Sequence, residues 1–197
     1  MLLAENQVIE RNLEHLPAGR VLLIDVLADG AIEAFRQQRS DIQWSAYTPF
    51  IDTYEALRPL SKQGQNFELH FGPWLSLDHS FDAVILYYPK TKLRFEYYLS
   101  FASKLLKDDG TFYVVGEKKG GVKSCEKTLK PFSIKPYKLD AARHCLMFAA
   151  AANGERCEKT FEQWFDTTQI SLEIAGQPIA VTMKALPGVF SANRIDE

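Results

Sequence analysis

The chain has 197 residues, of which 46% are hydrophobic and 24% are charged, and its formal net charge at pH 7 is −2. This length suffices to bury one sizeable core, and the composition excludes an intrinsically disordered chain. The near-neutral charge excludes a globally basic nucleic-acid-binding protein, so any electrostatic binding surface has to be local.

Membrane, disulfide and metal-binding classes are also disfavoured. No apolar run is long enough to span a bilayer, and residues 1–17 lack the basic start and apolar centre of a signal peptide. The cysteines are odd in number, none has Cys-x-x-Cys spacing, and the histidines form no ligand pairs with them. These residues are Cys125, Cys145, Cys157, His15, His70, His79 and His144. We therefore expect a cytoplasmic protein with reduced thiols, no bound metal and no membrane partner.

Apolar runs alternate with amphipathic stretches along the first three quarters of the chain. The predicted helices cover residues 4–16, 31–39, 93–106 and 124–130. The predicted strands cover residues 20–27, 42–47, 67–71, 81–88, 111–115, 135–137 and 145–149. Nearly continuous apolar strands are typical of a parallel sheet that is buried on both faces, and the intervening helices supply its crossovers. Residues 1–154 therefore predict a Rossmann-like α/β domain with a mostly parallel sheet and helices on both faces.

The pattern changes from Glu155 onward, where we place a second segment, residues 155–197. A short helix is predicted at residues 160–165. Residues 170–174 and 179–183 alternate apolar and polar side chains around a Gly-containing turn, which predicts a β-hairpin. The extended, apolar run at residues 186–191 indicates a connector toward a further domain.

Three segments carry a family resemblance. They are FDAVILYYPKTK at residues 81–92, TFYVVGEKKGGVKSCEK at residues 111–127 and TMKALPGVFS at residues 182–191. They resemble the N-terminal domain of the ribosomal RNA small subunit methyltransferase C family, which methylates guanine N2 in 16S rRNA. The resemblance implies a tandem duplication of a class I methyltransferase fold. The C-terminal copy would bind S-adenosylmethionine (SAM) and perform catalysis, and the N-terminal copy would bind no cofactor, contribute rRNA binding and support its partner.

The residues of the first predicted turn agree with a lost cofactor site. A class I methyltransferase needs a glycine-rich turn after its first strand, so that the backbone approaches SAM closely. In this chain only Gly30 remains. The side chains of Asp25, Leu27 and Asp29 would crowd that approach, and the two carboxylates would repel the carboxylate of SAM.

The other two signature positions are also altered. Tyr47 stands where the second strand normally ends in an acidic residue that binds the ribose, and we interpret it as packing at a sheet edge. The run Tyr87, Tyr88, Pro89 and Lys90 replaces the Asn-Pro-Pro-aromatic motif that positions an exocyclic amine. A phenol is a poor substitute for the paired amide geometry, and Lys90 cannot stack on a base as a ring does. Both tyrosines have two interpretations, aromatic packing at a strand end, which we favour, and stacking on an unpaired base.

Positive charge is concentrated in one segment. Residues 118–143 contain eight basic and two acidic residues, a local charge of +6 in a chain whose net charge is −2. The candidate RNA-binding residues are Lys118, Lys119, Lys123, Lys127 and Arg143, with Lys130, Lys135 and Lys138 in the same segment. The loop that begins at Lys118 follows a strand, where ligand crevices of open α/β sheets lie, and Ser124 is placed to cap the next helix. A solvated face kept for solubility is the alternative to phosphate binding.

The sequence thus predicts a non-catalytic N-terminal domain of a SAM-dependent 16S rRNA (guanine-N2)-methyltransferase. Its expected partners are 16S rRNA in the small ribosomal subunit and its own C-terminal catalytic domain, and SAM is expected only in that second domain. One alternative is a purely structural domain that supports the catalytic half without touching RNA. Another is an active SAM-binding methyltransferase, which the lost glycines disfavour.

Overall fold

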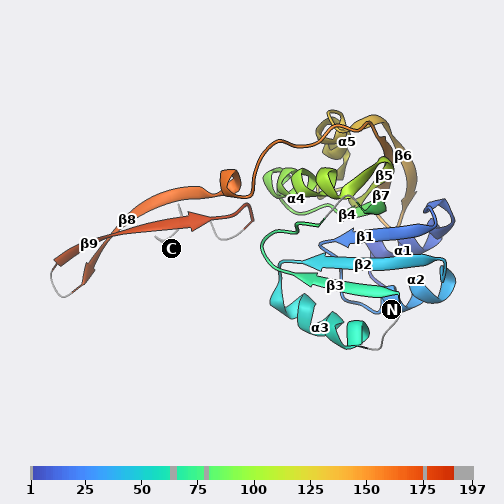
Figure 1. Ribbon diagram of the computed structural model, residues 1–197, viewed down its shortest axis with the longest axis horizontal. Helices are drawn as coiled ribbons and strands as arrows, with labels where there is room; N and C mark the ends of the chain where they lie inside the picture. The colour runs from blue at the N-terminus through green and yellow to red at the C-terminus, as the bar shows by residue number, and fades with distance from the viewer. Residues whose placement is uncertain (1, 63–65, 78–79, 175–176, 189–197) are drawn as a thin grey trace. The chain divides into compact units, whose positions relative to one another are not determined.

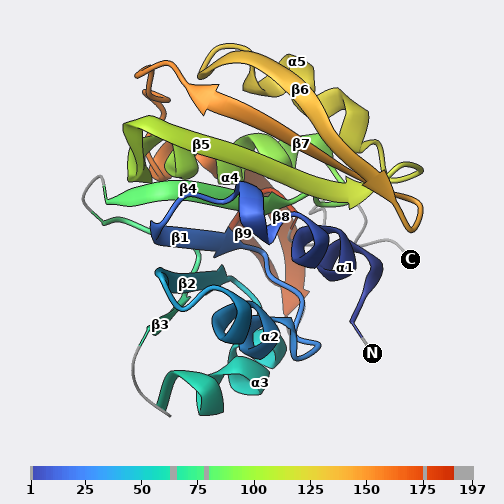
Figure 2. The ribbon, with the colours of Figure 1, turned by 90° about the vertical axis from the view of Figure 1, so that its right-hand side faces the viewer.

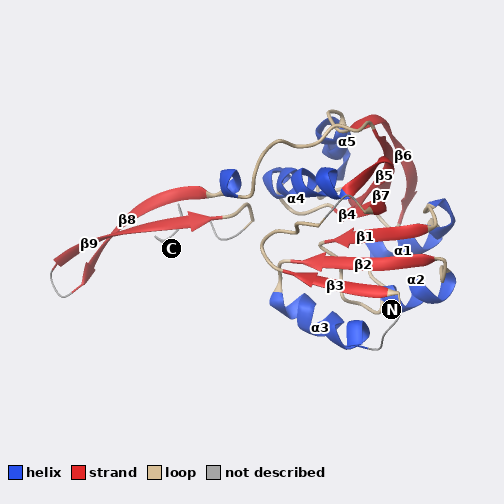
Figure 3. Cartoon of the chain, viewed as in Figure 1, coloured by secondary structure: helices blue, strands red, loops and turns tan. Residues whose placement is uncertain are grey.

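The computed structural model describes residues 2–62, 66–77, 80–174 and 177–188, and the chain divides into two compact units, residues 1–157 and 158–197. The first unit is built on a seven-stranded sheet in the order β3-β2-β1-β4-β5-β7-β6 (Figures 1 and 3). Its strands are β1 Gly19–Ile24, β2 Ile42–Thr48, β3 Phe67–Phe71, β4 Phe81–Tyr87, β5 Leu106–Glu117, β6 Ser133–Ala142 and β7 Cys145–Ala152. Its helices are α1 Ala4–Arg11, α2 Ala31–Gln38, α3 Ile51–Lys62, α4 Lys92–Leu105 and α5 Cys125–Leu129, with 3₁₀ turns η1 Leu13–His15 and η2 Val122–Ser124.

The sheet is mostly parallel, as predicted. Strands β1 to β5 pair in parallel, β7 pairs antiparallel with both β5 and β6, and β6 therefore runs in the same direction as the first five. Adjacent parallel strands need a crossover connection, and the helices between the strands in sequence supply it. The Rossmann-like fold class is confirmed.

Helices cover both faces of the sheet because each central strand is apolar on both sides (Figure 2). One face buries α1, α2 and α3 through Val8, Ile9, Phe35 and Leu57 in a single core with alternate residues of β1, β4, β5 and β7. On the other face the α4 side chain of Phe101 packs against Tyr47 of β2, with 5.1 Å between the ring centroids. Successive residues of a strand point to opposite faces of the sheet. Two neighbouring residues at a strand end therefore pack against different helical layers.

Several predicted boundaries are wrong. The helix α3 was not predicted, and it contains Pro59. It forms because Leu57 and Leu60 bury against the sheet, which outweighs the loss of one backbone donor. Strand β5 begins at Leu106, directly after α4, whereas the sequence predicted a strand only from residue 111 onward. Its first residue pairs with Phe81, and the register then shifts before residues 83 and 111 pair. The first helix stops at Arg11, because Asn12 leaves helical geometry.

The second unit contains the 3₁₀ turn η3 Glu162–Trp164 and an antiparallel hairpin of β8 Asp166–Ile174 and β9 Gln177–Ala185. The predicted hairpin is therefore confirmed, while its turn residues Ala175 and Gly176 lie outside the described residues. The same holds for Val189 to Ser191 of the predicted connector and for His79. The hairpin exposes the apolar side chains of Leu172, Ile179 and Met183.

Two absences hold for the part of the chain that the structure describes. It contains no helix that is long and apolar enough to cross a membrane. It also contains no group of three or more His, Cys, Asp or Glu side chains arranged to hold a metal ion.

Candidate functional site

The first candidate region lies at the carboxyl ends of β1 and β4, where nucleotide crevices of open α/β sheets are found. Asp25 follows β1 with a backbone φ of 64°, and its side chain turns toward α4. A nitrogen of Arg94 lies 3.4 Å from its carboxylate, and both side chains are 16% exposed. Arg94 also donates to the hydroxyl of Tyr98 at 2.7 Å and lies over the ring of Phe50 at 4.4 Å. The carboxylate that the sequence placed in the crevice is thus engaged by the protein itself.

Burial sets the protonation behaviour of Asp25. Burial raises the pKa of its carboxyl above the usual value, and the nearby Arg94 and a hydrogen bond with Tyr98 lower the pKa by less. The Arg94 guanidinium offsets the charge of Asp25, whereas Asp29 has no cationic partner among the described residues, so the predicted repulsion of an anionic ligand stays a prediction.

Asp29 fixes the remainder of the first turn to α1. Its carboxylate accepts hydrogen bonds from the side-chain amide of Asn6 at 2.7 Å, from the backbone N–H of Ala31 at 3.1 Å and from the backbone N–H of Leu3. Gly30 follows with φ of 87°, and a Cβ there would meet only Glu33 at 3.8 Å. The one surviving glycine is therefore explained by left-handed backbone before α2, without any close ligand approach.

Tyr87 and Tyr88 point to opposite layers of the molecule, as strand alternation requires. Tyr87 is 4% exposed, and its hydroxyl donates to the side-chain oxygen of Asn6. Since Asn6 in turn donates to Asp29, a chain of hydrogen bonds, buried at Tyr87 and partly buried at Asp29, connects the altered amine-binding position to the altered first turn. Burial raises the pKa of Tyr87 strongly, with smaller contributions from Asp29 and Glu5. Tyr87 cannot stack on a base in this position, so the packing interpretation is correct for it.

The side chain of Tyr88 lies on the face of the sheet that α4 covers. Its ring packs on Phe95 with 4.9 Å between centroids, and its hydroxyl lies 2.6 Å from that of Ser124. Pro89 is buried and Lys90 is exposed. Ser124 also donates to the carbonyl of Gly121 and makes no capping hydrogen bond, so the predicted cap of the following helix is wrong.

Tyr47 is packed, as predicted, but not at a sheet edge. Strand β2 lies between β1 and β3, and Tyr47 is completely buried. Its hydroxyl donates to the backbone carbonyl of Gly72 at 2.9 Å, and its ring meets Tyr98 and Phe101 edge-on. Burial raises the pKa of Tyr47 far above its ordinary value, with neighbouring Tyr97, Tyr98 and Asp25 adding to the shift. The Tyr47 hydroxyl therefore stays neutral and acts as a hydrogen-bond donor within the core.

The second candidate region is the basic segment that follows β5. The backbone N–H of Lys118 donates to the carbonyl of His144 at 2.9 Å, which places the loop beside the β6–β7 turn that carries Arg143. Gly116, at the end of β5, packs against Tyr88 and Val122, so the base of the loop is firmly held. The five predicted RNA-binding side chains are exposed, and none forms an ion pair with a described residue. They are Lys118, Lys119, Lys123, Lys127 and Arg143.

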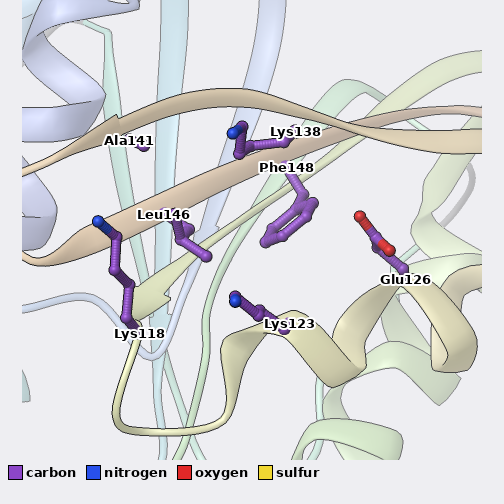
Figure 4. Close-up of a pocket in the computed structure, with 7 residues that line it drawn as sticks. All are labelled: Lys118, Lys123, Glu126, Lys138, Ala141, Leu146 and Phe148. Carbon is purple, nitrogen blue, oxygen red and sulfur yellow. The ribbon is translucent and has the colours of Figure 1, made fainter.

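A pocket of about 510 Å³ opens within this basic segment (Figure 4). Its floor is apolar, formed by Leu146 and Phe148 of β7, and its rim carries lysines and one carboxylate. The lining residues are Lys118, Lys123, Glu126, Lys138, Ala141, Leu146 and Phe148. Two of the five predicted residues, Lys118 and Lys123, thus meet in one pocket, whereas Lys119, Lys127 and Arg143 do not line it.

Sequence reasoning missed three residues that organise these regions. Asn6 is completely buried on the same side of α1 as Ile9, and a polar residue on an apolar helix face was the available signal. Arg94, at the start of α4, gave no signal among the many exposed basic residues. Lys138 was noticed only as one charge of the segment, because its pairing with Phe148 depends on the register of β6 and β7.

Comparison with known proteins agrees with this geometry. The family described as "Methyltransferase small domain N-terminal" matches residues 6–168. The chain belongs to this family. It is also similar to ribosomal RNA small subunit methyltransferase C of Shewanella piezotolerans, with 33% identity over all of this chain and 55% of the relative. The corresponding protein of Pseudoalteromonas atlantica is 34% identical over the same shares. The chain thus spans about half the length of these curated relatives, and it matches their N-terminal part.

Solved structures support the fold of this methyltransferase small N-terminal domain. A 16S rRNA N2 methyltransferase of T. thermophilus, in complex with AdoMet and guanosine, aligns with a TM-score of 0.70 and 16% identity. The alignment covers 98% of this chain and 50% of that one. A predicted O-methyltransferase of Agrobacterium tumefaciens aligns with a TM-score of 0.56 and 15% identity over 73% of this chain and 80% of that one.

Proposed function

We propose that this domain is the non-catalytic N-terminal half of a SAM-dependent 16S rRNA (guanine-N2)-methyltransferase. In this proposal it binds rRNA and supports the catalytic half, and the full-length protein works with the small ribosomal subunit in the cytoplasm. The family membership and the similarity to ribosomal RNA small subunit methyltransferase C support the methyltransferase context. The observation that carries the non-catalytic role is the buried hydrogen-bond chain from Tyr87 through Asn6 to Asp29.

The residues at the former cofactor position do not fit SAM. A SAM site needs backbone that is free to approach the ligand and acceptors that are free to bind it. Here Asp25 is paired with Arg94, Asp29 accepts three N–H hydrogen bonds from the protein, and the ribose-binding position is the buried Tyr47. Binding SAM would break these internal contacts, and no equivalent donor or acceptor would replace them.

Isothermal titration of the chain with SAM tests this part of the proposal. We expect no heat of binding for this chain, whereas the full-length protein, as the control, should bind one SAM per molecule. Stoichiometric binding of SAM to the 197-residue chain would refute the proposal that its crevice is closed.

The lysine-rich segment is proposed to contact phosphates. Lysines that lack carboxylate partners bind phosphates through counterion release, which makes the affinity depend on salt concentration and little on base sequence. The exposed Lys118 and Lys119 lie on a loop whose base is fixed by Gly116 and by the hydrogen bond to His144. A fixed array of cations is better suited to a structured RNA than a mobile tail, because less conformational entropy is lost on binding.

A double charge reversal tests the RNA contact. We expect Lys118→Glu with Lys119→Glu to weaken binding to 16S rRNA fragments by at least about tenfold at 0.15 M salt and to flatten the salt dependence. The matched control, Arg58→Glu with Lys62→Glu on α3, makes the same charge change elsewhere and should bind like wild type. If both double variants bind RNA like wild type, the assignment of RNA contact to the basic loop is refuted. If wild type itself shows no salt-dependent binding to rRNA fragments, the purely structural role is favoured instead.

Support of the catalytic half is proposed to use the hairpin. The exposed Leu172, Ile179 and Met183 of β8 and β9 provide apolar surface on a two-stranded sheet, which is marginally stable by itself. Packing of the second half against the hairpin would stabilise both parts, in accordance with the general behaviour of exposed apolar patches.

A further inference from the structure

Two phenylalanine rings are exposed at the carboxyl edge of the sheet. Phe71 is the last residue of β3 and pairs with Thr48, the last residue of β2, and Phe50 follows shortly after Thr48. In Figure 1 the tips of β2 and β3 lie next to each other where α3 begins. Phe50 is 40% exposed and Phe71 is 48% exposed, whereas Tyr47 and Tyr87 at the same edge are buried. Large apolar side chains that are exposed together mark a contact surface.

The protein holds both rings in place. The backbone N–H of Phe50 donates to the hydroxyl of Thr48 at 3.1 Å, and the carbonyl of Phe50 accepts from the N–H of Tyr54 at 3.0 Å. The ring of Tyr54 packs on that of Phe71, with 4.9 Å between centroids. The guanidinium of Arg94 lies 4.4 Å from the centroid of the Phe50 ring. Because the rings are fixed before a ligand arrives, little conformational entropy is lost when a flat group stacks on them.

Unpaired cations continue along the same edge. Strands β1 to β5 are parallel, so their carboxyl ends all lie at one edge of the sheet. Lys90 follows β4, and Lys118 and Lys119 follow β5. All three lysines are exposed, and none forms an ion pair with a described residue. The order β3-β2-β1-β4-β5 separates the rings from the basic loop by four strand spacings, about 19 Å. A stacked RNA strand advances about 3.4 Å per nucleotide, so about six nucleotides cover this distance.

The charge and the size of this surface favour RNA over a protein partner. Lysines without carboxylate partners attract phosphates, and exposed aromatic rings offer flat surfaces on which bases stack. In the first turns of α3, Glu55 is paired with Arg58 at 3.0 Å, which leaves Asp52 as one exposed carboxylate against three lysines. A stable protein interface buries about 800 Å² on each partner, more than two half-exposed rings and the neighbouring Ile51 supply.

We propose that the carboxyl edge of the sheet binds a single-stranded segment of RNA, with unpaired bases stacked on Phe50 and Phe71 and the adjoining phosphates on Lys90, Lys118 and Lys119. The proposal rests on the RNA-binding function proposed above, and it adds that the bound RNA is unpaired and names the side chains that hold its bases. Unpaired bases are free to leave the helix and stack on aromatic side chains. Such stacking accepts any base, because every base has an aromatic face.

Fluorescence anisotropy with labelled RNA probes tests this surface. The probes are octauridylate, an octamer with the same backbone but abasic at every position, and tetrauridylate. We expect octauridylate to bind at least about tenfold more tightly than the abasic octamer at 0.15 M salt, since both carry the same phosphates and only one carries bases that stack. Tetrauridylate should bind more weakly than octauridylate, because it is too short to reach the rings and the lysines together.

Paired substitutions attribute the difference to the two rings. Phe50→Leu with Phe71→Leu keeps the side chains apolar but removes both rings, so octauridylate should bind it no more tightly than the abasic octamer does. The matched control, Phe50→Tyr with Phe71→Tyr, keeps both rings and should bind each probe like wild type. Both positions are exposed, so each variant should fold, and thermal melting of the chain checks this.

The outcomes separate this inference from the function beneath it. If wild type binds octauridylate and the abasic octamer equally, or if the leucine variant keeps the difference, stacking is refuted while phosphate contact still stands. If wild type binds neither octamer even at low salt, the proposed RNA contact fails and this inference fails with it. If the leucine variant binds RNA like wild type and lowers the melting temperature only of the full-length protein, the rings are a protein interface and stacking is refuted. Loss of abasic-octamer binding in the Lys118→Glu, Lys119→Glu variant, with part of the octauridylate affinity retained, would support separate contacts to bases and phosphates.

Discussion

The charged side chains at the carboxyl end of β1 have partners within the protein, whereas those that follow the carboxyl end of β5 form no ion pairs with described residues. At β1, Asp25 and Asp29 are each held by partners from elsewhere in the chain, Arg94 and Asn6. At β5, none of Lys118, Lys119 and Lys123 forms an ion pair with a described residue. A site whose polar groups are satisfied internally gains little from a ligand, whereas unpaired charges on a rigid base gain much from a counterion. The unpaired charges therefore favour the carboxyl end of β5 over that of β1 as the place for the proposed RNA contact.

The largest effect is expected at the hydrogen-bond chain that joins Tyr87, Asn6 and Asp29. Asn6→Ala leaves the Tyr87 hydroxyl and one Asp29 oxygen without their buried partner and creates a cavity, and it should lower the free energy of unfolding by about 3 kcal/mol. Urea denaturation measures this change. Tyr87→Phe is the matched variant, because it removes only one hydroxyl and should cost about 1 kcal/mol. Equal stability of Asn6→Ala and wild type would show that the hydrogen-bond chain does not close the crevice.

A somewhat smaller effect is expected at the base of the basic loop. In Gly116→Ala the new Cβ would lie 2.7 Å from the Cβ of Tyr88, so the strand end must shift. We expect a loss of about 2 kcal/mol in unfolding free energy, together with weaker RNA binding because the lysines are displaced. Gly120→Ala is the control, since its Cβ would lie 3.4 Å from the carbonyl of Glu117 and its φ is not positive. Similar RNA affinity for both variants would indicate that loop position is unimportant.

Two carboxylates at opposite ends of the parallel strands, Asp82 near the start of β4 and Asp25 after the end of β1, should change the stability with opposite dependence on pH. Burial raises the pKa of Asp82, but Lys107 at 2.6 Å and the N–H of Arg20 at 2.8 Å together hold it below 3.8. Asp82 therefore stabilises the fold above pH 3.8, and this contribution is lost as the pH falls through the lower folded-state pKa. Asp82→Asn should cost about 1 kcal/mol at pH 7, and the difference from wild type should shrink in acid.

Asp25 has a raised pKa, so its contribution is fully present below pH 3.8 and is lost as the pH rises through the folded-state value. The stability of wild type relative to Asp25→Asn should therefore increase on acidification, in the direction opposite to Asp82→Asn. Thermal melts between pH 3 and pH 7 measure both differences. Parallel pH profiles for the two variants would show that burial does not dominate at Asp25.

The smallest effect is expected from a single exposed lysine. Lys119→Ala removes one charge at the rim of the basic surface and should reduce the slope of log affinity against log salt by about 0.7 on single-stranded RNA, without changing base preference. Lys62→Ala on α3 is the control and should leave the slope unchanged. An unchanged slope in Lys119→Ala would show that this lysine contacts no phosphate.

Local sequence patterns predicted most of the sheet but not the details that depend on distant contacts. Strands β2 and β3 were placed almost residue for residue, because short apolar runs with turn residues at their ends leave few alternatives. The helix α3 was missed because Pro59 normally argues against a helix interior, and only the burial of Leu57 and Leu60 overrides this preference. The start of β5 was missed because its first residues pair across a register shift, which no local pattern reveals.

The sequence by itself determined the parallel architecture, the altered cofactor motifs and the concentration of positive charge, since each is a property of residues that lie close together along the chain. Only the tertiary structure decided what these residues do. It directs Tyr87 and Tyr88 into opposite layers, joins Asn6 to Asp29 across 23 residues, and brings Lys138 over the floor formed by Phe148. The physical reason is that hydrogen-bond partners and pocket walls are set by strand register and helix packing, which residues far apart in the chain fix together.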